Sequence, residues 1–228
     1  MGRTMAPNFA PDKTPTMFLK ITSLLAISAL ATMPHDPLPN LAIGTNLPAA
    51  DTRMKDVSGS EISLKDAAGT NGLDVVFSCN TCPFVVGNED SEGWEGRYPA
   101  LAAFVQRHGM GIVFVNSNTT KRDAGDGFAD MQARYKEKKY AGYYVLDEGN
   151  KVADAFGART TPHVFLFDKD MKLAYKGAID DNVGKAAEVK ERYLEMAVAA
   201  VAAGKAAEPN TTRNIGCSIK RVAVPHTH

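Results

Sequence analysis

Two cysteines separated by two residues, directly after an apolar run, constrain the fold of this chain more than any other feature. Cys79 and Cys82 follow the run Val75-Val76-Phe77, and Pro83 comes next. This context predicts a buried strand that ends at a dithiol, with a helix beginning at the proline. The N-terminus of a helix carries partial positive charge, which stabilises a thiolate and lowers the pKa of a cysteine. A second thiol two residues away can then close a short disulfide, so the motif predicts redox chemistry.

Composition excludes several other classes of protein. The 228 residues are enough for one domain with extensions, and the 44% apolar and 23% charged content is that of a globular protein. The 26 basic and 26 acidic residues balance and no basic tract stands out, so nucleic acid is not an expected partner. Only three cysteines are present, Cys79, Cys82 and Cys217, too few for a scaffold held by disulfides, which leaves them free for chemistry.

Residues 1–31 have the pattern of an export signal peptide, with Met17 as an alternative start. The charged start Met17-Phe18-Leu19-Lys20 precedes an apolar stretch at 21–30, and Ala29-Leu30-Ala31 fits the cleavage pattern. The stretch is shorter than the ~20 residues that span a bilayer. We therefore expect no stable membrane span and a periplasmic or secreted location. A frayed N-terminal helix is the alternative.

Apolar and amphipathic segments alternate through the predicted domain at residues 32–204, which opens with an extended lead-in at 32–50. Period-two and apolar runs predict strands at 73–77, 111–115, 143–146, 163–167 and 173–175. Helical periodicity predicts helices at 98–108, 128–138, 152–156 and 188–203. The pattern indicates an α/β fold with a central mixed sheet and helices on both faces. Residues 205–228 are expected to be an irregular tail that packs on the domain.

Thr161 and Pro162 directly precede the predicted strand at 163–167. A proline here can simply mark the start of a strand. Together with the upstream dithiol it predicts a cis-proline loop facing the sulfurs, since an X-Pro bond adopts the cis form at a cost of only ~0.5–1 kcal/mol. In that geometry the backbone of Thr161 can pair with an extended substrate chain.

Five motifs, in order, resemble the peroxiredoxin-like branch of the thioredoxin family, whose members are also described as redoxins or alkyl hydroperoxide reductase/thiol-specific antioxidant proteins. The resemblance extends over about residues 38–221. The motifs are Cys-Asn-Thr-Cys-Pro-Phe-Val (79–85), Val-Asn-Ser-Asn (115–118), Thr-Pro-His-Val-Phe-Leu-Phe-Asp (161–168), Gly-Ala-Ile-Asp-Asp (177–181) and Gly-Cys-Ser-Ile-Lys (216–220).

This resemblance implies a thioredoxin-like fold and an oxidoreductase that needs no organic cofactor. By analogy, Cys79 is the exposed nucleophile, Cys82 the resolving thiol and Pro162 the cis-proline. The favoured reaction is attack of the Cys79 thiolate on a protein or small-molecule disulfide, followed by resolution by Cys82. An unidentified thiol electron donor would then recycle the pair. The direction of the reaction, oxidation or reduction, does not follow from the residues.

The runner-up is an antioxidant thiol peroxidase in which Cys82, followed by Pro83, is the peroxidatic cysteine. That family places a threonine three residues before this cysteine, but Cys79 stands there. It also needs an arginine nearby, for which Arg159 is the candidate, as a residue that steers an anionic or peroxidic substrate. A surface charge is the ordinary interpretation of Arg159.

A further class of function is a copper-binding carrier of thioredoxin fold, since thiolate and imidazole ligands suit Cu(I). A structural zinc site lacks its second cysteine pair, and no metal is expected. The candidate copper ligands beside the dithiol are His108, His163, His226 and His228.

Two other residues have open roles. Cys217 is either a small buried residue of the tail or an accessory redox thiol that exchanges with the Cys79–Cys82 pair. Asn116 follows the predicted strand at 111–115, where it either lines the dithiol pocket or caps the next helix.

Overall fold

The computed structural model describes residues 1–2, 38 and 40–222. The predicted export signal, apart from Met1 and Gly2, lies outside these residues. The chain divides into one unit at residues 1–36 and another at 37–228, and only the second is described below. Within the described part of the chain, no helix is long and apolar enough to cross a membrane.

Seven strands form one mixed sheet in the order β2-β1-β5-β4-β3-β7-β8. The neighbours β3–β4 and β4–β5 are parallel, and the pairs toward both edges are antiparallel. The strand that leads into the dithiol, β3, is therefore in the interior of the sheet. The strands are β1 (Met54–Asp56), β2 (Glu61–Ile62), β3 (Gly72–Ser78), β4 (Met110–Asn116), β5 (Tyr143–Leu146), β7 (His163–Asp168) and β8 (Leu173–Gly177).

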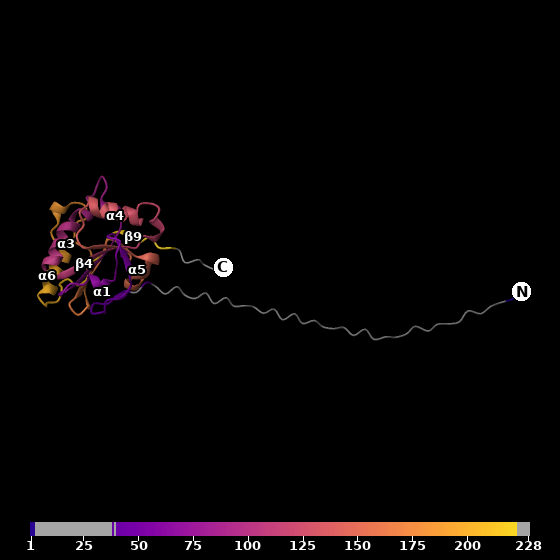
Figure 1. The fold of residues 1–228 in the computed structure, drawn as a ribbon, viewed down its shortest axis with the longest axis horizontal. Helices are drawn as coiled ribbons and strands as arrows, with labels where there is room; N and C mark the ends of the chain where they lie inside the picture. Colours follow the sequence, from indigo (N-terminus) through magenta and orange to yellow (C-terminus); the bar gives the residue numbers. More distant parts are fainter. Residues whose placement is uncertain (3–37, 39, 223–228) are drawn as a thin grey trace. The chain divides into compact units, whose positions relative to one another are not determined.

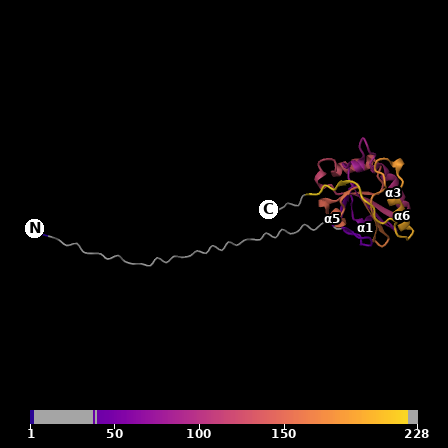
Figure 2. The same cartoon turned by 180° about the vertical axis from the view of Figure 1, so that it is seen from behind.

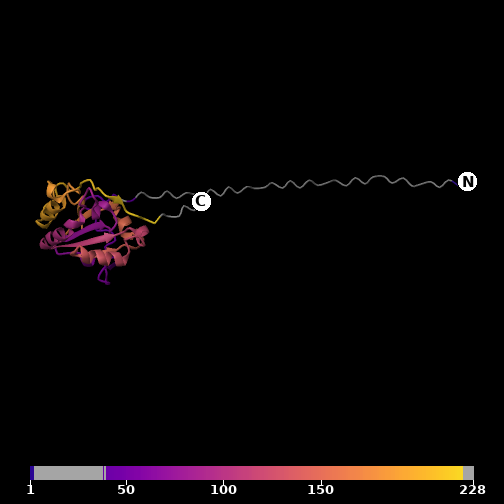
Figure 3. The same cartoon turned by 90° about the horizontal axis from the view of Figure 1, so that it is seen from above.

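Side chains of the central strands alternate between two hydrophobic cores, one on each face of the sheet. In β3, Val76 joins one core while Val75 and Phe77 join the other. Helices cover both faces, as the sequence predicts (Figures 1 and 3). The first core is covered by α3 (Tyr98–Arg107), α4 (Phe128–Glu137) and α6 (Tyr193–Ala202), and the second by α1 (Leu64–Ala67) and α5 (Lys151–Phe156).

The helix after the dithiol is a single turn. This helix, α2 (Pro83–Val86), has Cys82 as its N-cap residue and proline in its first turn. The backbone N–H groups of Val85 and Val86 donate to the Cys82 carbonyl oxygen, and Gly87 ends the helix at φ 81°. Cys82 thus lies at the helix start, and Cys79 lies in the short link between β3 and α2.

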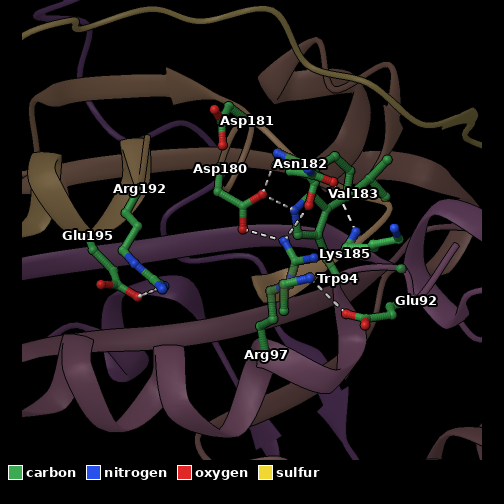
Figure 4. Close-up of polar contacts among 12 residues, drawn as sticks. Glu92, Trp94, Arg97, Asp180, Asp181, Asn182, Val183, Lys185, Arg192 and Glu195 are labelled. Carbon is green, nitrogen blue, oxygen red and sulfur yellow. Dashed lines mark hydrogen bonds and ion pairs between the residues drawn. The ribbon is translucent and has the colours of Figure 1, made fainter. Parts of the chain in front are cut away.

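Buried polar contacts fix the segment after α2 to the loop after β8 (Figure 4). The indole N–H of Trp94 donates to one carboxylate oxygen of Asp180 at 2.7 Å, and Arg97 pairs with the other at 2.5 Å. Arg97 also donates to the Asn182 carbonyl oxygen at 2.7 Å. Because the Trp94 backbone N–H donates in turn to the carbonyl of Phe84, these contacts hold the exit of α2 in place.

The C-terminal segment runs back over the domain after α6 (Figure 2). Its backbone bonds to β8, from Lys176 to Asn210 and from Thr212 to Lys176. It then forms a second, two-stranded sheet, in which β9 (Cys217–Ser218) pairs antiparallel with β6 (Thr160–Thr161). The expectation of an irregular tail is wrong for β9, because two residues are too few to leave a periodic pattern. This pairing brings Cys217 opposite Thr161, the residue that the sulfurs of the dithiol face.

Candidate active site

Both sulfurs of the Cys79–Cys82 motif face Thr161, whose peptide bond to Pro162 is cis. The sulfur of Cys79 lies 3.2 Å from the Thr161 hydroxyl oxygen. The Cys82 thiol donates to the Thr161 carbonyl oxygen at 3.1 Å. The predicted arrangement of a dithiol opposite a cis-proline loop is therefore present, and all three cysteines are free thiols.

Cys79 is completely buried, and Cys82 is only 3% exposed. The expectation that Cys79 is an exposed nucleophile is thus wrong as regards exposure. The physical reason is its position, because Cys79 follows the interior strand β3 directly and lies beneath the Thr161 hydroxyl. Of the two residues, Cys82 is the slightly more exposed.

The two thiols differ in acidity. The neighbouring Cys79 thiol is the largest influence on Cys82. Together with Cys217 and Thr161 it lowers the pKa of Cys82 to about 5, even though burial opposes this. Conversely, Cys82, then burial and the nearby Asp126 carboxylate, raise the pKa of Cys79 well above its ordinary value. A buried thiol beside a carboxylate is poorly suited to ionise. These effects favour ionisation of Cys82 over ionisation of Cys79.

A buried carboxylate organises the backbone between the two cysteines. Asp126 accepts from the Asn80 backbone N–H at 2.6 Å and from the Thr81 hydroxyl at 2.7 Å. The side-chain amides of Asn116 and Asn118 each donate to it at 3.0 Å. Four donors satisfy this carboxylate and fix the conformation of the dithiol link.

Asn116 belongs to this network and does not face the sulfurs. Its amide also contacts the Tyr144 hydroxyl at 3.2 Å, and its carbonyl accepts from Arg122 at 2.8 Å. It is completely buried. Both expectations for Asn116, a pocket residue or a helix cap, are wrong, since its polar atoms are directed at Asp126, Tyr144 and Arg122 and at the Asn118 backbone.

Cys217 lies beside Cys82. In the register of β6 and β9 it stands opposite Thr161. It packs against the core cluster that contains Cys79 and Cys82, and its thiol and backbone N–H contribute to the lowered pKa of Cys82. Burial, followed by the contact with Cys82, raises the pKa of Cys217 to about 11. The three sulfurs form one cluster with Cys82 in its middle.

The backbone edge of Thr161 is already paired. The prediction that an extended substrate chain pairs there is wrong for this conformation, because the chain's own β9 occupies the edge. Gly216 permits this close approach, since a Cβ atom at that position would lie 2.3 Å from the Thr161 carbonyl oxygen. A substrate must reach the sulfurs by another route or displace β9.

Arg159 and His163 lie in a different cavity. This cavity of about 240 Å³ is also lined by Lys176, and none of the three cysteines lines it. The predicted steering of a substrate at the dithiol by Arg159 therefore finds no support in its position. Burial, together with Lys176 and Arg159, lowers the pKa of His163 to about 3, so the imidazole is neutral.

The structure does not support the metal-binding alternative in residues 40–222. No group of three His, Cys, Asp or Glu side chains there is placed to hold a metal ion. His108 ends α3, where its ring bonds to the Phe104 carbonyl at 2.9 Å. His226 and His228 lie outside the described residues.

Comparison with known proteins decides the family. The family model described as AhpC/TSA matches residues 45–176, more than half of the chain. The chain belongs to the AhpC/TSA family. It is therefore a thioredoxin-like redoxin, in a family of oxidoreductases that act on thiols or peroxides. No curated protein sequence matches it.

Solved structures support the same fold for this AhpC/TSA-family protein. A hypothetical protein from Sinorhizobium meliloti 1021 is 31% identical, with a TM-score of 0.72, covering 82% of this chain and 98% of that one. An uncharacterized conserved protein from Geobacillus kaustophilus is 27% identical, with a TM-score of 0.73, covering 82% and 95%. A thioredoxin-like protein in its oxidised form is 16% identical, with a TM-score of 0.52, covering 72% and 99%.

Two buried acidic residues of this AhpC/TSA-family protein have little signal in the sequence. Asp126 accepts a hydrogen bond from the backbone of Asn80, which lies 46 positions earlier in the chain. The only local signal at Asp126 is its position between Gly125 and Gly127. Asp74 interrupts the apolar run of β3, is completely buried, and has no hydrogen-bond partner for its carboxylate among the described residues. Burial raises the pKa of Asp74 well above its ordinary value and so favours the neutral form of its carboxyl group.

Proposed function

We propose that this protein is a thiol–disulfide oxidoreductase in which Cys82 is the attacking thiolate and Cys79 the resolving thiol. The observation that carries the proposal is the unequal placement of the two sulfurs around Thr161. Cys82 lies at the start of α2, where the Cys79 and Cys217 thiols lower its pKa, whereas Cys79 is completely buried and the Asp126 carboxylate raises its pKa. These roles are the reverse of those implied by analogy with thioredoxins.

The reaction follows from these roles. The Cys82 thiolate attacks one sulfur of a substrate disulfide, a mixed disulfide forms, and the other substrate sulfur leaves as a thiolate and takes up a proton. Cys79 then loses its proton and attacks the Cys82 sulfur, which closes the Cys79–Cys82 disulfide and releases the reduced substrate. The low pKa of Cys82 also makes its thiolate a good leaving group when another thiol attacks the partner sulfur of a disulfide that Cys82 has formed.

A second candidate is a thiol peroxidase that uses Cys82 as the peroxidatic cysteine. The pKa of about 5 at Cys82, directly before Pro83, favours it, because peroxide also reacts with a thiolate. Two residues that a peroxidatic cysteine needs are missing beside Cys82. Cys79 stands at the position of the threonine, and Arg159, the candidate arginine, lines another cavity. Disulfide exchange needs neither residue, so it remains the first proposal.

Insulin reduction and hydrogen peroxide consumption by the purified protein, with the same thiol donor, distinguish the two candidates. We expect insulin reduction that is lost in Cys82→Ser and in Cys79→Ser/Cys217→Ser, where no second thiol remains to resolve the mixed disulfide. Peroxide consumption that survives Cys79→Ser but not Cys82→Ser, without insulin reduction, would favour the peroxidase instead.

We also propose that the protein acts after export, with a thiol electron donor in that compartment. The pattern at residues 1–31 supports this location. A reporter fused after residue 31 tests it, and retention of the reporter in the cytoplasm would contradict the proposal.

A further inference from the structure

The C-terminal strand brings a third thiol into contact with the redox pair. β9 is short, but its place is strongly constrained, because Gly216 packs against the Thr161 carbonyl and Cys217 stands opposite Thr161 in the register. The following residues continue the attachment, with Ile219 N–H donating to the Arg159 carbonyl at 3.0 Å and Lys220 N–H donating to Asn118 at 2.9 Å. Cys217 is thus held at the pair by contacts on both of its sides.

The three sulfurs differ in access from solvent. Cys79 and Cys82 are buried, and Cys217 is half-buried. A thiol donor that approaches from outside therefore meets Cys217 before it meets the pair. β9 also covers the backbone edge of Thr161, where an incoming chain would otherwise pair.

We propose that Cys217 is a third catalytic thiol, which relays electrons from an external dithiol donor to the buried Cys79–Cys82 pair. The inference rests on the proposed thiol–disulfide function and adds the residue through which the pair is recycled.

The relay consists of three successive thiol–disulfide exchange reactions. The Cys217 thiolate attacks the Cys82 sulfur of the Cys79–Cys82 disulfide, so that a Cys82–Cys217 disulfide forms and Cys79 leaves and takes up a proton. One thiolate of the donor then attacks the Cys217 sulfur, and Cys82 leaves as a thiolate. The second thiol of the donor attacks its own mixed disulfide, which releases Cys217 as a thiol and the donor as a disulfide. Two electrons pass from the donor to the pair.

The oxidised state favours the first of these steps. In the reduced protein, burial and the contact with Cys82 both raise the pKa of Cys217. When a disulfide joins Cys79 and Cys82, Cys82 carries no negative charge and no longer raises the pKa of Cys217. Lys220 lowers the pKa of Cys217 and remains in either state. Cys217 is thus more easily ionised when it is needed as a nucleophile.

Two measurements on the full chain test the relay. In the first, Cys79→Ser is oxidised and its disulfides are mapped by mass spectrometry after non-reducing digestion. The relay predicts an intramolecular Cys82–Cys217 disulfide. Its absence would overturn the proposal, because no substrate or donor is needed for this bond to form.

In the second measurement, oxidised protein is re-reduced by thioredoxin, and insulin reduction by pre-reduced protein is followed in a separate single turnover. Cys217→Ser is expected to slow re-reduction by about tenfold more than it slows the insulin step. Equal losses in the two steps, or no loss, would overturn the relay. Ser218→Ala, at the neighbouring exposed position, is the matched control and should change neither rate.

These results separate the relay from the proposed function. If the pre-reduced wild-type protein reduces no insulin, the proposed function fails. The mapping of the Cys82–Cys217 bond in Cys79→Ser does not depend on that result, because it uses no substrate. If insulin is reduced and that bond is absent, the relay alone fails.

Discussion

The Asp126 carboxylate accepts a 2.6 Å hydrogen bond from the backbone N–H of Asn80, the residue between the two redox cysteines that follows Cys79. Asp126 belongs to the loop after β4 and the cysteines follow β3, so this bond joins the ends of two neighbouring parallel strands. It sets the conformation of the dithiol link and places negative charge beside Cys79. The assignment of the thiolate to Cys82 depends in part on this charge.

Replacement of Asp126 by asparagine should therefore affect both stability and acidity. Asp126→Asn replaces one accepting carboxylate oxygen by an NH2 donor that faces other donors, so we expect the free energy of unfolding to fall by about 2–3 kcal/mol. The pKa of Cys79 should fall, because a source of negative charge is removed. Chemical denaturation and thiol labelling as a function of pH measure the two effects. Asp123→Asn, exposed in the same loop, is the control and should change neither.

The labelling rate of Cys82 should depend on pH with a midpoint near 5, because its pKa is lowered to about 5. The thiolate reacts and the thiol does not, so the rate rises through this pH. Cys79→Ala removes the largest cause of the lowered pKa and should move the midpoint upward. Labelling by iodoacetamide, resolved by peptide, follows each cysteine separately. A midpoint for Cys82 near ~8.5, the ordinary value for a thiol, would contradict this prediction.

Asp74 should make the protein less stable as pH rises. Its folded pKa is raised, while in the unfolded chain an aspartate ionises near ~3.9. Above about pH 4 the unfolded state therefore releases a proton that the folded state retains, which favours unfolding. In Asp74→Asn this contribution is absent, so the stability of the variant relative to wild type should increase with pH. A difference that stays constant from pH 4 to pH 8 would show that the carboxyl group is not held neutral.

A side chain at position 216 should loosen the C-terminal strand. Gly216→Ala would place a Cβ atom 2.3 Å from the Thr161 carbonyl oxygen. Since this oxygen belongs to the backbone, the clash can be relieved only if β6 or β9 shifts. We expect a loss of about 1–3 kcal/mol in stability and faster labelling of Cys217 as β9 moves away. Gly96→Ala, where nothing lies within 4 Å of the added atom, is the control. Unchanged Cys217 labelling in Gly216→Ala would count against the close packing of β9.

The regular elements of the fold follow from the sequence because each has a long apolar pattern. The predicted strands at 73–77, 111–115 and 163–167 correspond to β3, β4 and β7. The elements that the sequence does not predict are short. β1, β2 and α1 have three, two and four residues, and β9 has two, too few for a period to be visible. The final helix begins at Tyr193 and not near 188, because residues 186–188 form a separate 3-10 turn.

The candidate site is predictable as far as local motifs extend. The dithiol, Thr161 and Pro162 are each marked by their immediate neighbours in the sequence. Asp126 and the contact of Cys217 with Cys82 arise only when distant segments meet in the fold, so spacing along the chain could not indicate them. The exposure expected for Cys79 comes from analogy, and the packing beneath Thr161 overrides it.

The most direct test of the central claim is the identity of the cysteine that forms the mixed disulfide with a substrate. Cys217→Ser is included in both variants so that it cannot resolve the intermediate. With insulin as substrate, Cys79→Ser/Cys217→Ser should accumulate a mixed disulfide, mapped by mass spectrometry to Cys82, and Cys82→Ser/Cys217→Ser should form none. A mixed disulfide through Cys79 in the second variant, with none in the first, would contradict the assignment of Cys82 as the attacking thiolate.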